Sequence, residues 1–175
     1  MQDEQASGHP SERGSDLIGT APGFLIRRAQ QVHAGMWAAI VSADVTIPQF
    51  AVLRALHDEA WIDQTTLSDR AALDRSNTAD VVHRLAKRDL IYRHRDIDDG
   101  RRRLLGLTPK GEALYLSLLP ATQLLNKRLL AALDPLSRVE LSRLLALVVE
   151  GSEQDLAQLL RSHQEAERED VDEAR

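Results

Sequence analysis

Basic side chains gather in one stretch of an otherwise acidic chain. Residues 70 to 110 hold eleven Arg or Lys against six Asp, a local net charge of +5, whereas the remaining residues sum to −10. A basic stretch in an acidic protein is typical of a binding site for a polyanion, and nucleic acid is the first polyanion to consider. The alternative is a solvated charged face, and charge alone does not separate the two interpretations. The pattern within the stretch has to decide.

A second group of side chains suits a small carboxylate. Arg27 has the fork geometry that captures a carboxylate with two hydrogen bonds. His33 and Trp37, four residues apart on one helix face, offer a hydrogen bond and an aromatic wall. Arg27 and His33 lie about 120° apart around the helix, so one ligand needs long side chains or one residue from each of two subunits. Alternatively, these are surface and packing residues.

Several other chemistries are excluded or disfavoured. The chain has no cysteine, so thiolate metal sites, cysteine nucleophiles and thiol redox sensing are excluded. The six histidines are scattered, Asp96, Asp98 and Asp99 lack calcium-loop spacing, and no glycine-rich phosphate loop occurs. We therefore expect no metal, no cofactor and no enzymatic activity. No apolar run is long enough to span a membrane and no signal peptide is evident, so we expect a cytoplasmic protein without a membrane partner.

Helices dominate the predicted elements. A polar tail of residues 1–18 is expected to be disordered, and an acidic end of residues 163–175 to be frayed. Apolar periodicity and Thr, Asp and Pro start signals predict helices over residues 22–43, 46–56, 64–72, 75–86, 109–133 and 135–150. The last helix continues or restarts up to Ser162, and Pro120 is expected to kink the one before it.

One β-hairpin interrupts the helices. Leu90–Arg95 and Arg103–Leu107 have strand character on either side of the turn Asp96–Gly100. This order of elements is typical of a winged helix-turn-helix, in which two helices, a short helix and a further helix precede a hairpin. The sequence therefore predicts a mainly α fold with a small β-hairpin wing.

Two segments carry a family resemblance. LSDRAALDRSNTADVVHRLAKRDLIYR and RDIDDGRRRLLGLTPKGEAL closely resemble the MarR family of bacterial transcription regulators, and residues 22 to 150 follow that family's pattern in order. The resemblance implies one MarR-type domain over residues 19–162. Its DNA-reading part spans about 46–108, and its dimerisation helices about 22–43 and 109–162. Asp89 stands where the family usually has Gly, and Gly100 where the wing often carries a polar residue or Arg.

The recognition helix is expected at residues 75–88. Ala79, Val82, Leu85 and Ala86 form its predicted buried stripe, and the predicted groove-facing side chains are Asn77, Asp80, Val81, Arg84 and Lys87 or Arg88. N-terminal residues of such a helix reach base edges. The predicted base-reading residues are Arg75, Ser76, Asn77 and Thr78, with Arg84 on a base or a phosphate. Otherwise Ser76 only supports the helix start and Arg84 is solvated.

The wing supplies a second predicted contact. Arg101 is the candidate for the minor groove, and Asp99 resembles the family's acid that steadies a wing arginine. Arg102 and Arg103 alternate across the strand, so at most one shares a direction with Arg101. Arg95, like Arg93, is a candidate for a phosphate contact or an ion pair between subunits.

The leucine-rich terminal helices predict a homodimer, although they could instead form a monomer's own core. A dimer places two recognition helices about one DNA turn apart, which predicts a near-palindromic operator in double-stranded DNA. Arg27 and His33 match the aromatic-acid-responsive branch of the family, with Gln49 and His57 as weaker pocket candidates. The resemblance thus implies a repressor released by a small aromatic carboxylate. The alternatives are a ligand-independent or activating regulator, or a winged-helix protein-interaction module.

Overall fold

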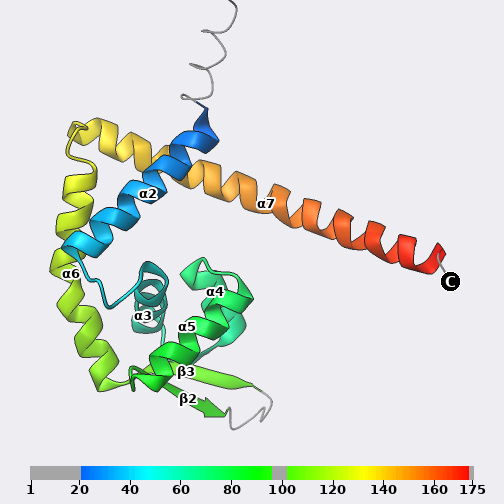
Figure 1. The fold of residues 1–175 in the computed structure, drawn as a ribbon, viewed down its shortest axis with the longest axis horizontal. Coiled ribbons are helices and arrows are strands. Elements are labelled where there is room, and N and C mark those ends of the chain that lie inside the picture. Colours follow the sequence, from blue (N-terminus) through cyan, green and yellow to red (C-terminus); the bar gives the residue numbers. More distant parts are fainter. Residues whose placement is uncertain (1–20, 96–101, 174–175) are drawn as a thin grey trace, which may run out of the picture. The chain divides into compact units, whose positions relative to one another are not determined.

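The computed structural model describes residues 21–95 and 102–173 (Figure 1). Within these residues lie six helices and three short strands, in the order α2 (Pro22–Ile40), α3 (Ile47–Asp58), β1 (Ile62–Asp63), α4 (Gln64–Ala71), α5 (Arg75–Lys87), β2 (Ile91–Arg95), β3 (Arg103–Leu107), α6 (Pro109–Leu129) and α7 (Pro135–Glu173). The described residues form two compact units, divided between Leu129 and Leu130. The expected mainly helical fold with a hairpin wing is confirmed.

The predicted capping residues begin their helices. The Thr46 hydroxyl accepts a hydrogen bond from the Gln49 backbone N–H at 3.3 Å, and the Gln49 side chain accepts one from the Thr46 N–H at 3.1 Å. This reciprocal pair satisfies two backbone donors at the start of α3. Asp63 and Asp74 cap α4 and α5, and each accepts a hydrogen bond from the backbone N–H three residues further on.

Helix α3 lies at the centre of the first unit. It packs against α4, α5, α6 and β3, and its Leu53 and Leu56 are completely buried. Leu67 from α4, Leu85 from α5 and Leu105 from β3 complete the core on its other sides. Figure 1 shows α3, α4 and α5 gathered beside the hairpin. The recognition helix is therefore anchored by its apolar side to a core shared with the wing.

The wing contains one strand that sequence reasoning missed. The sheet order is β1-β3-β2, with all pairs antiparallel, and Ile62 of β1 pairs with Leu105 of β3. A two-residue strand carries no readable alternation of its own, so only the pairing reveals it.

A left-handed residue leads from the recognition helix into the wing. Asp89, at the position where the family usually has Gly, adopts φ 57°, a conformation that Asp tolerates better than most non-Gly residues. Its carbonyl accepts a hydrogen bond from the Thr108 hydroxyl at 2.7 Å. The turn geometry that Gly usually provides is thus reached with Asp at this position.

The second unit consists mainly of α7. Asp134 caps the helix by accepting hydrogen bonds from the backbone N–H groups of Leu136 and Ser137 at 2.9 and 3.1 Å. The helix passes through Gly151 without a break and reaches Glu173, so the end predicted to fray after Ser162 is helical. One Gly costs a helix only about 1 kcal/mol, and Ala, Leu, Gln and Glu around it are good helix formers.

The N-terminal tail of residues 1–18 lies outside the described residues. No helix among those described is both long enough and apolar enough to cross a membrane.

Candidate nucleic-acid interface and effector cavity

The starts of α4 and α5 are each held by one carboxylate, from Asp63 and Asp74. Asp63 accepts a hydrogen bond from the Thr66 backbone N–H at 2.9 Å, and its second oxygen pairs with Arg102 of the wing. The Thr66 N–H and the Arg102 guanidinium lower the pKa of Asp63 to about 2. Asp74 accepts hydrogen bonds from the backbone and side-chain N–H groups of Asn77, both at 2.8 Å, which lowers the Asp74 pKa.

The exposed face of α5 differs in part from the predicted one. Arg75, Ser76, Asn77 and Arg84 are exposed, as base or phosphate contacts require. Thr78 is not: it is fully buried, and its hydroxyl donates to the Asp74 carbonyl at 2.9 Å. We therefore remove Thr78 from the base-reading set.

Two further positions on α5 differ from the prediction, which had Ala79 buried and Val81 facing the groove. Val81 is buried and Ala79 is exposed. The buried stripe consequently runs through Thr78, Val81, Val82 and Leu85. The reason is that α5 turns its larger aliphatic side chains toward α3 and α4, so the small Ala79 is left outside.

The wing arginines fall into two groups. Arg95 is exposed at the end of β2, opposite Arg103 of β3. Arg102 is half-exposed and engaged with Asp63, so it ties the wing to the start of α4. Asp99 and Arg101, the predicted minor-groove pair, lie outside the described residues.

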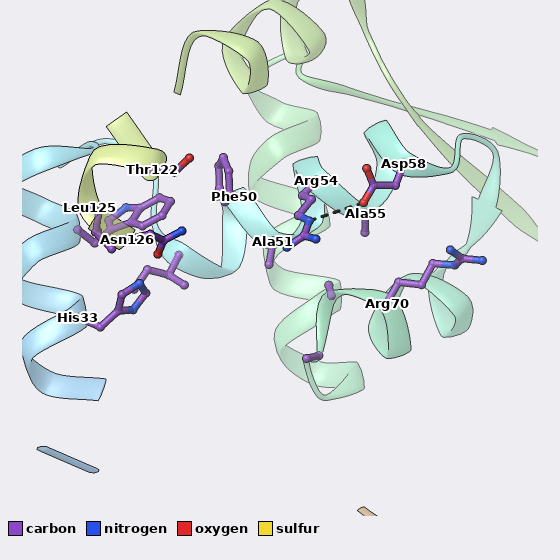
Figure 2. Close-up of a pocket in the computed structure, with 14 residues that line it drawn as sticks. His33, Phe50, Ala51, Arg54, Ala55, Asp58, Arg70, Thr122, Leu125 and Asn126 are labelled. Atoms are coloured by element: carbon purple, nitrogen blue, oxygen red, sulfur yellow. Dashed lines mark ion pairs between the residues drawn. The ribbon is translucent and has the colours of Figure 1, made fainter. Parts of the chain in front are cut away.

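A cavity of about 490 Å³ opens between α2, α3, α4 and α6 of the first unit (Figure 2). One part of its wall is aromatic, since Trp37 and Phe50 lie with ring centroids 5.1 Å apart and His33 lies 6.4 Å from Trp37. Thr122 and Asn126 from α6 are at this same end in Figure 2. The cavity therefore has rings and uncharged polar groups side by side.

The other part of the wall is charged. Arg54 pairs with Asp58 one turn further along α3, at 3.6 Å, and both side chains are more than half exposed. Arg70 from α4 also lines this part and pairs with Glu59. A ring-bearing acid can thus meet rings at one end and guanidinium groups at the other.

The predicted effector residues do not all reach this cavity. His33 and Trp37 line it. Arg27 does not, and its guanidinium lies over the Phe24 ring at 5.6 Å. Gln49 is buried in the capping box of α3, and His57 faces Glu112 at 2.8 Å and Tyr115 at 4.6 Å between ring centroids. Gln49 and His57 therefore do not line this cavity, although His57 lines a second one, and their part in ligand binding stays a prediction.

Sequence reasoning missed Arg54, Arg70 and Asn126. A signal for Arg54 was present: Ile47, Ala51, Arg54 and Asp58 recur at three- and four-residue steps on α3, the spacing of one helix face. No local pattern marks Arg70 or Asn126, because these residues come from two other helices. Among the described residues no cluster of three potential metal ligands occurs.

These features define a winged helix-turn-helix protein whose exposed recognition helix carries polar and cationic side chains. Comparison with known proteins agrees with this class. Residues 45–102 match the family model described as MarR family. The chain is 32% identical over 109 residues to the transcriptional regulator HosA of Escherichia coli O157:H7, covering 62% of this chain and 80% of that protein.

Two solved structures extend the similarity. The PcaV transcriptional regulator of Streptomyces coelicolor, in complex with its natural ligand, is 41% identical with a TM-score of 0.74, covering 76% of this chain and 94% of that one. BpsR of Bordetella bronchiseptica, whose DNA binding is regulated by 6-hydroxynicotinic acid, is 30% identical with a TM-score of 0.69, covering 73% of this chain and 97% of that one. The chain belongs to the MarR family and is a DNA-binding transcriptional regulator, not an enzyme.

Proposed function

We propose that this protein is a homodimeric repressor that leaves a near-palindromic operator when a small aromatic carboxylate binds the cavity of the first unit. The observation that carries the proposal is the lining: Trp37 and Phe50 suit a ring, while Arg54 and Arg70 suit an acid group. BpsR, a relative regulated by an aromatic acid, supports this ligand class.

Arg54 is the anchor that the cavity offers for the acid group. Its ion pair with Asp58 spans 3.6 Å between two largely exposed side chains, and such pairs contribute about 0–1 kcal/mol. A ligand carboxylate can therefore replace Asp58 as the partner of the Arg54 guanidinium at a small cost in free energy. Arg27, which lies away from the cavity of its own chain, remains a candidate only as a contribution from a second subunit.

The dimer rests on exposed apolar side chains. Helix α7 exposes many, with Leu136 82% and Val139 69% exposed, and α2 exposes Leu25, Ile26 and Val32. Such surfaces are seldom left in water and usually mark contacts with another chain. Two copies present two recognition helices, which is the reason for expecting operator symmetry.

For the DNA contacts we keep the exposed residues of α5 and the wing. We assign Asn77 and Arg75 to base edges, since Asn pairs with adenine and Arg with guanine. We assign Ser76 and Arg84 to the same surface, and Arg95 to a phosphate. The proposal that Arg101 enters the minor groove beside Asp99, with Arg102 as a neighbouring contact, stands on the sequence.

Thermal unfolding with a panel of acids tests the effector. The panel is benzoate, its hydroxylated derivatives and 6-hydroxynicotinic acid, with aliphatic acids of similar size for comparison. A ligand at 100 times its dissociation constant stabilises the folded protein by about 2.7 kcal/mol. We expect a shift with at least one aromatic acid that is lost in Arg54→Met.

The matched control is Arg28→Ala, which removes an exposed cation from α2 that does not line the cavity. It should retain the shift, and Arg27→Ala reports whether a second subunit contributes. If no acid shifts the transition while DNA affinity still falls steeply with salt, the ligand-independent regulator replaces this proposal. A shift unchanged in Arg54→Met and in His33→Ala contradicts the assignment of the cavity.

A further inference from the structure

The segment between α2 and α3 is held from two sides at neighbouring peptide carbonyls. On one side, the Trp37 indole N–H donates to the Val45 carbonyl at 2.7 Å. On the other, the Arg88 guanidinium donates to the Asp44 carbonyl at 3.1 Å. Trp37 belongs to the cavity wall, and Arg88 is the C-terminal capping residue of the recognition helix. Two consecutive residues thus join the cavity to the DNA-reading helix.

Trp37 controls this segment by more than its indole. Its backbone carbonyl accepts hydrogen bonds from the N–H groups of Val41 and Ser42, at 2.9 and 3.2 Å, where α2 ends. Trp37 as a whole is only 6% exposed, and its ring lies against Phe50. A ligand that moves this ring within the cavity therefore moves the end of α2 and the Val45 carbonyl together.

The segment is too tightly bonded to absorb such a displacement. The Ser42 hydroxyl accepts hydrogen bonds from the Asp44 and Val45 N–H groups, both at 3.0 Å. Val45 is buried in the core, and Thr46 is locked in the capping box of α3. Because the Asp44 and Val45 carbonyls share this short framework, a shift at one is passed to the other.

Arg88 passes the shift to the recognition helix. Its own carbonyl accepts a hydrogen bond from the Lys110 ammonium of α6 at 2.7 Å, so the end of α5 is held between α6 and the α2–α3 segment. The bond from the Arg88 side chain to the Asp44 carbonyl lies at the surface, where it can break without unfolding the core.

We propose that Arg88 is a positioning residue that couples occupancy of the Trp37-walled cavity to the placement of α5, through the Asp44 and Val45 carbonyls. This inference rests on the proposed effector site and adds its route to the DNA. In the effector-free state the Arg88 bond holds α5 in its reading position. A ligand that displaces Trp37 weakens the bond and frees the end of the helix.

The test compares Arg88→Gln with Lys87→Gln. Both remove one positive charge from the end of α5, but only Arg88 bonds to the α2–α3 segment. DNA affinity is measured, on a duplex enriched from random sequence, without and with the acid that shifts the wild-type transition. The readout is the DNA dissociation constant with the acid divided by the constant without it. A phosphate contact that is lost in both states changes both constants by the same factor, so it does not change this ratio. Thermal unfolding confirms that both variants fold.

We expect the ratio to fall at least threefold in Arg88→Gln and to stay at the wild-type value in Lys87→Gln, while both variants still bind the acid. Coupling between two sites typically amounts to 5–150-fold, so a threefold loss is measurable. A wild-type ratio in Arg88→Gln overturns the inference. A ratio that falls equally in Lys87→Gln also overturns it, because charge alone then explains the loss.

A ligand-free measurement covers the case in which no acid binds and the effector proposal itself fails. Coupling is reciprocal, so DNA must also act on Trp37. Trp61→Phe leaves Trp37 as the single tryptophan. Its fluorescence should change when the enriched duplex is added, and this change should be absent in Trp61→Phe/Arg88→Gln. The same change in both proteins, or no change in either, refutes the Arg88 route whatever the effector.

Discussion

Gly111, at the start of α6, permits a close backbone contact between that helix and Leu90, the residue before β2. A Cβ added at this residue would lie 2.0 Å from the Leu90 carbonyl oxygen and 2.9 Å from the Leu90 carbonyl carbon. The Gly111 N–H donates to the Thr108 hydroxyl at 3.0 Å, and the Thr108 N–H donates to the same Leu90 oxygen at 3.1 Å. The Gly at the end of the LTPKG motif is therefore required by packing.

Gly111→Ala should consequently destabilise the protein. Since normal carbon–oxygen contacts exceed about 3 Å, the start of α6 must retreat by roughly 1 Å or more from Leu90. Overpacking of this kind costs about 1–3 kcal/mol. Loss of the hydrogen bond from Thr108 to Leu90 adds about 1 kcal/mol. The expected total is about 2–4 kcal/mol.

Chemical and thermal denaturation measure this loss. For a chain of this length, 1 kcal/mol corresponds to a Tm change of about 2–4 °C, so the expected decrease is about 4–16 °C. The matched control is Gly35→Ala in α2, where an added Cβ meets nothing within 4 Å. Because Ala favours a helix interior over Gly, this control should raise Tm slightly. Equal Tm values for Gly111→Ala and the wild type would refute the packing argument.

Two further predictions concern the helix-turn-helix. Because the Asp63 pKa is lowered to about 2 in the folded protein, its ionised form contributes stability above about pH 4, and this contribution is lost as the pH falls toward 2. The Tm difference between wild type and Asp63→Asn should therefore be largest at neutral pH and shrink between pH 4 and 2; a constant difference contradicts the assigned ion pair. Thr78→Val removes the buried bond to the Asp74 carbonyl, so it should lower stability by about 1 kcal/mol and leave base preference, measured by selection from randomised duplexes, unchanged. Asn77→Ala should alter that preference, and an altered preference in Thr78→Val would return Thr78 to the DNA contacts.

Local signals in the sequence were sufficient for most of the fold. Helix starts at Thr46, Asp63 and Asp74 depend on hydrogen bonds within three residues, so residue type and spacing predict them. The hairpin and the start of α6 at Pro109 follow from equally local rules. The exposed residues Asn77 and Arg84 were placed correctly by helical periodicity alone.

Periodicity did not determine which side of a helix faces the core where small and β-branched residues alternate. Ala79 and Thr78 are both compatible with burial or exposure, and packing against α3 and α4 decided the matter. The hydroxyl of Thr78 is satisfied by the Asp74 carbonyl of its own helix. This local bond allows a polar side chain to be fully buried.

The sequence by itself determined the winged helix-turn-helix order and the cationic stretch of residues 70–110, because those properties depend on local caps, periodicity and charge. The role as a regulator followed from the resemblance to the MarR family. Tertiary structure alone decided the cavity. Its charged wall comes from Arg54 and Arg70 on two different helices, and Arg27, the expected anchor, lies elsewhere. The link from Trp37 through Val45 and Asp44 to Arg88 spans more than 40 residues of sequence. No local pattern encodes such a contact, because only the packed core brings its ends together.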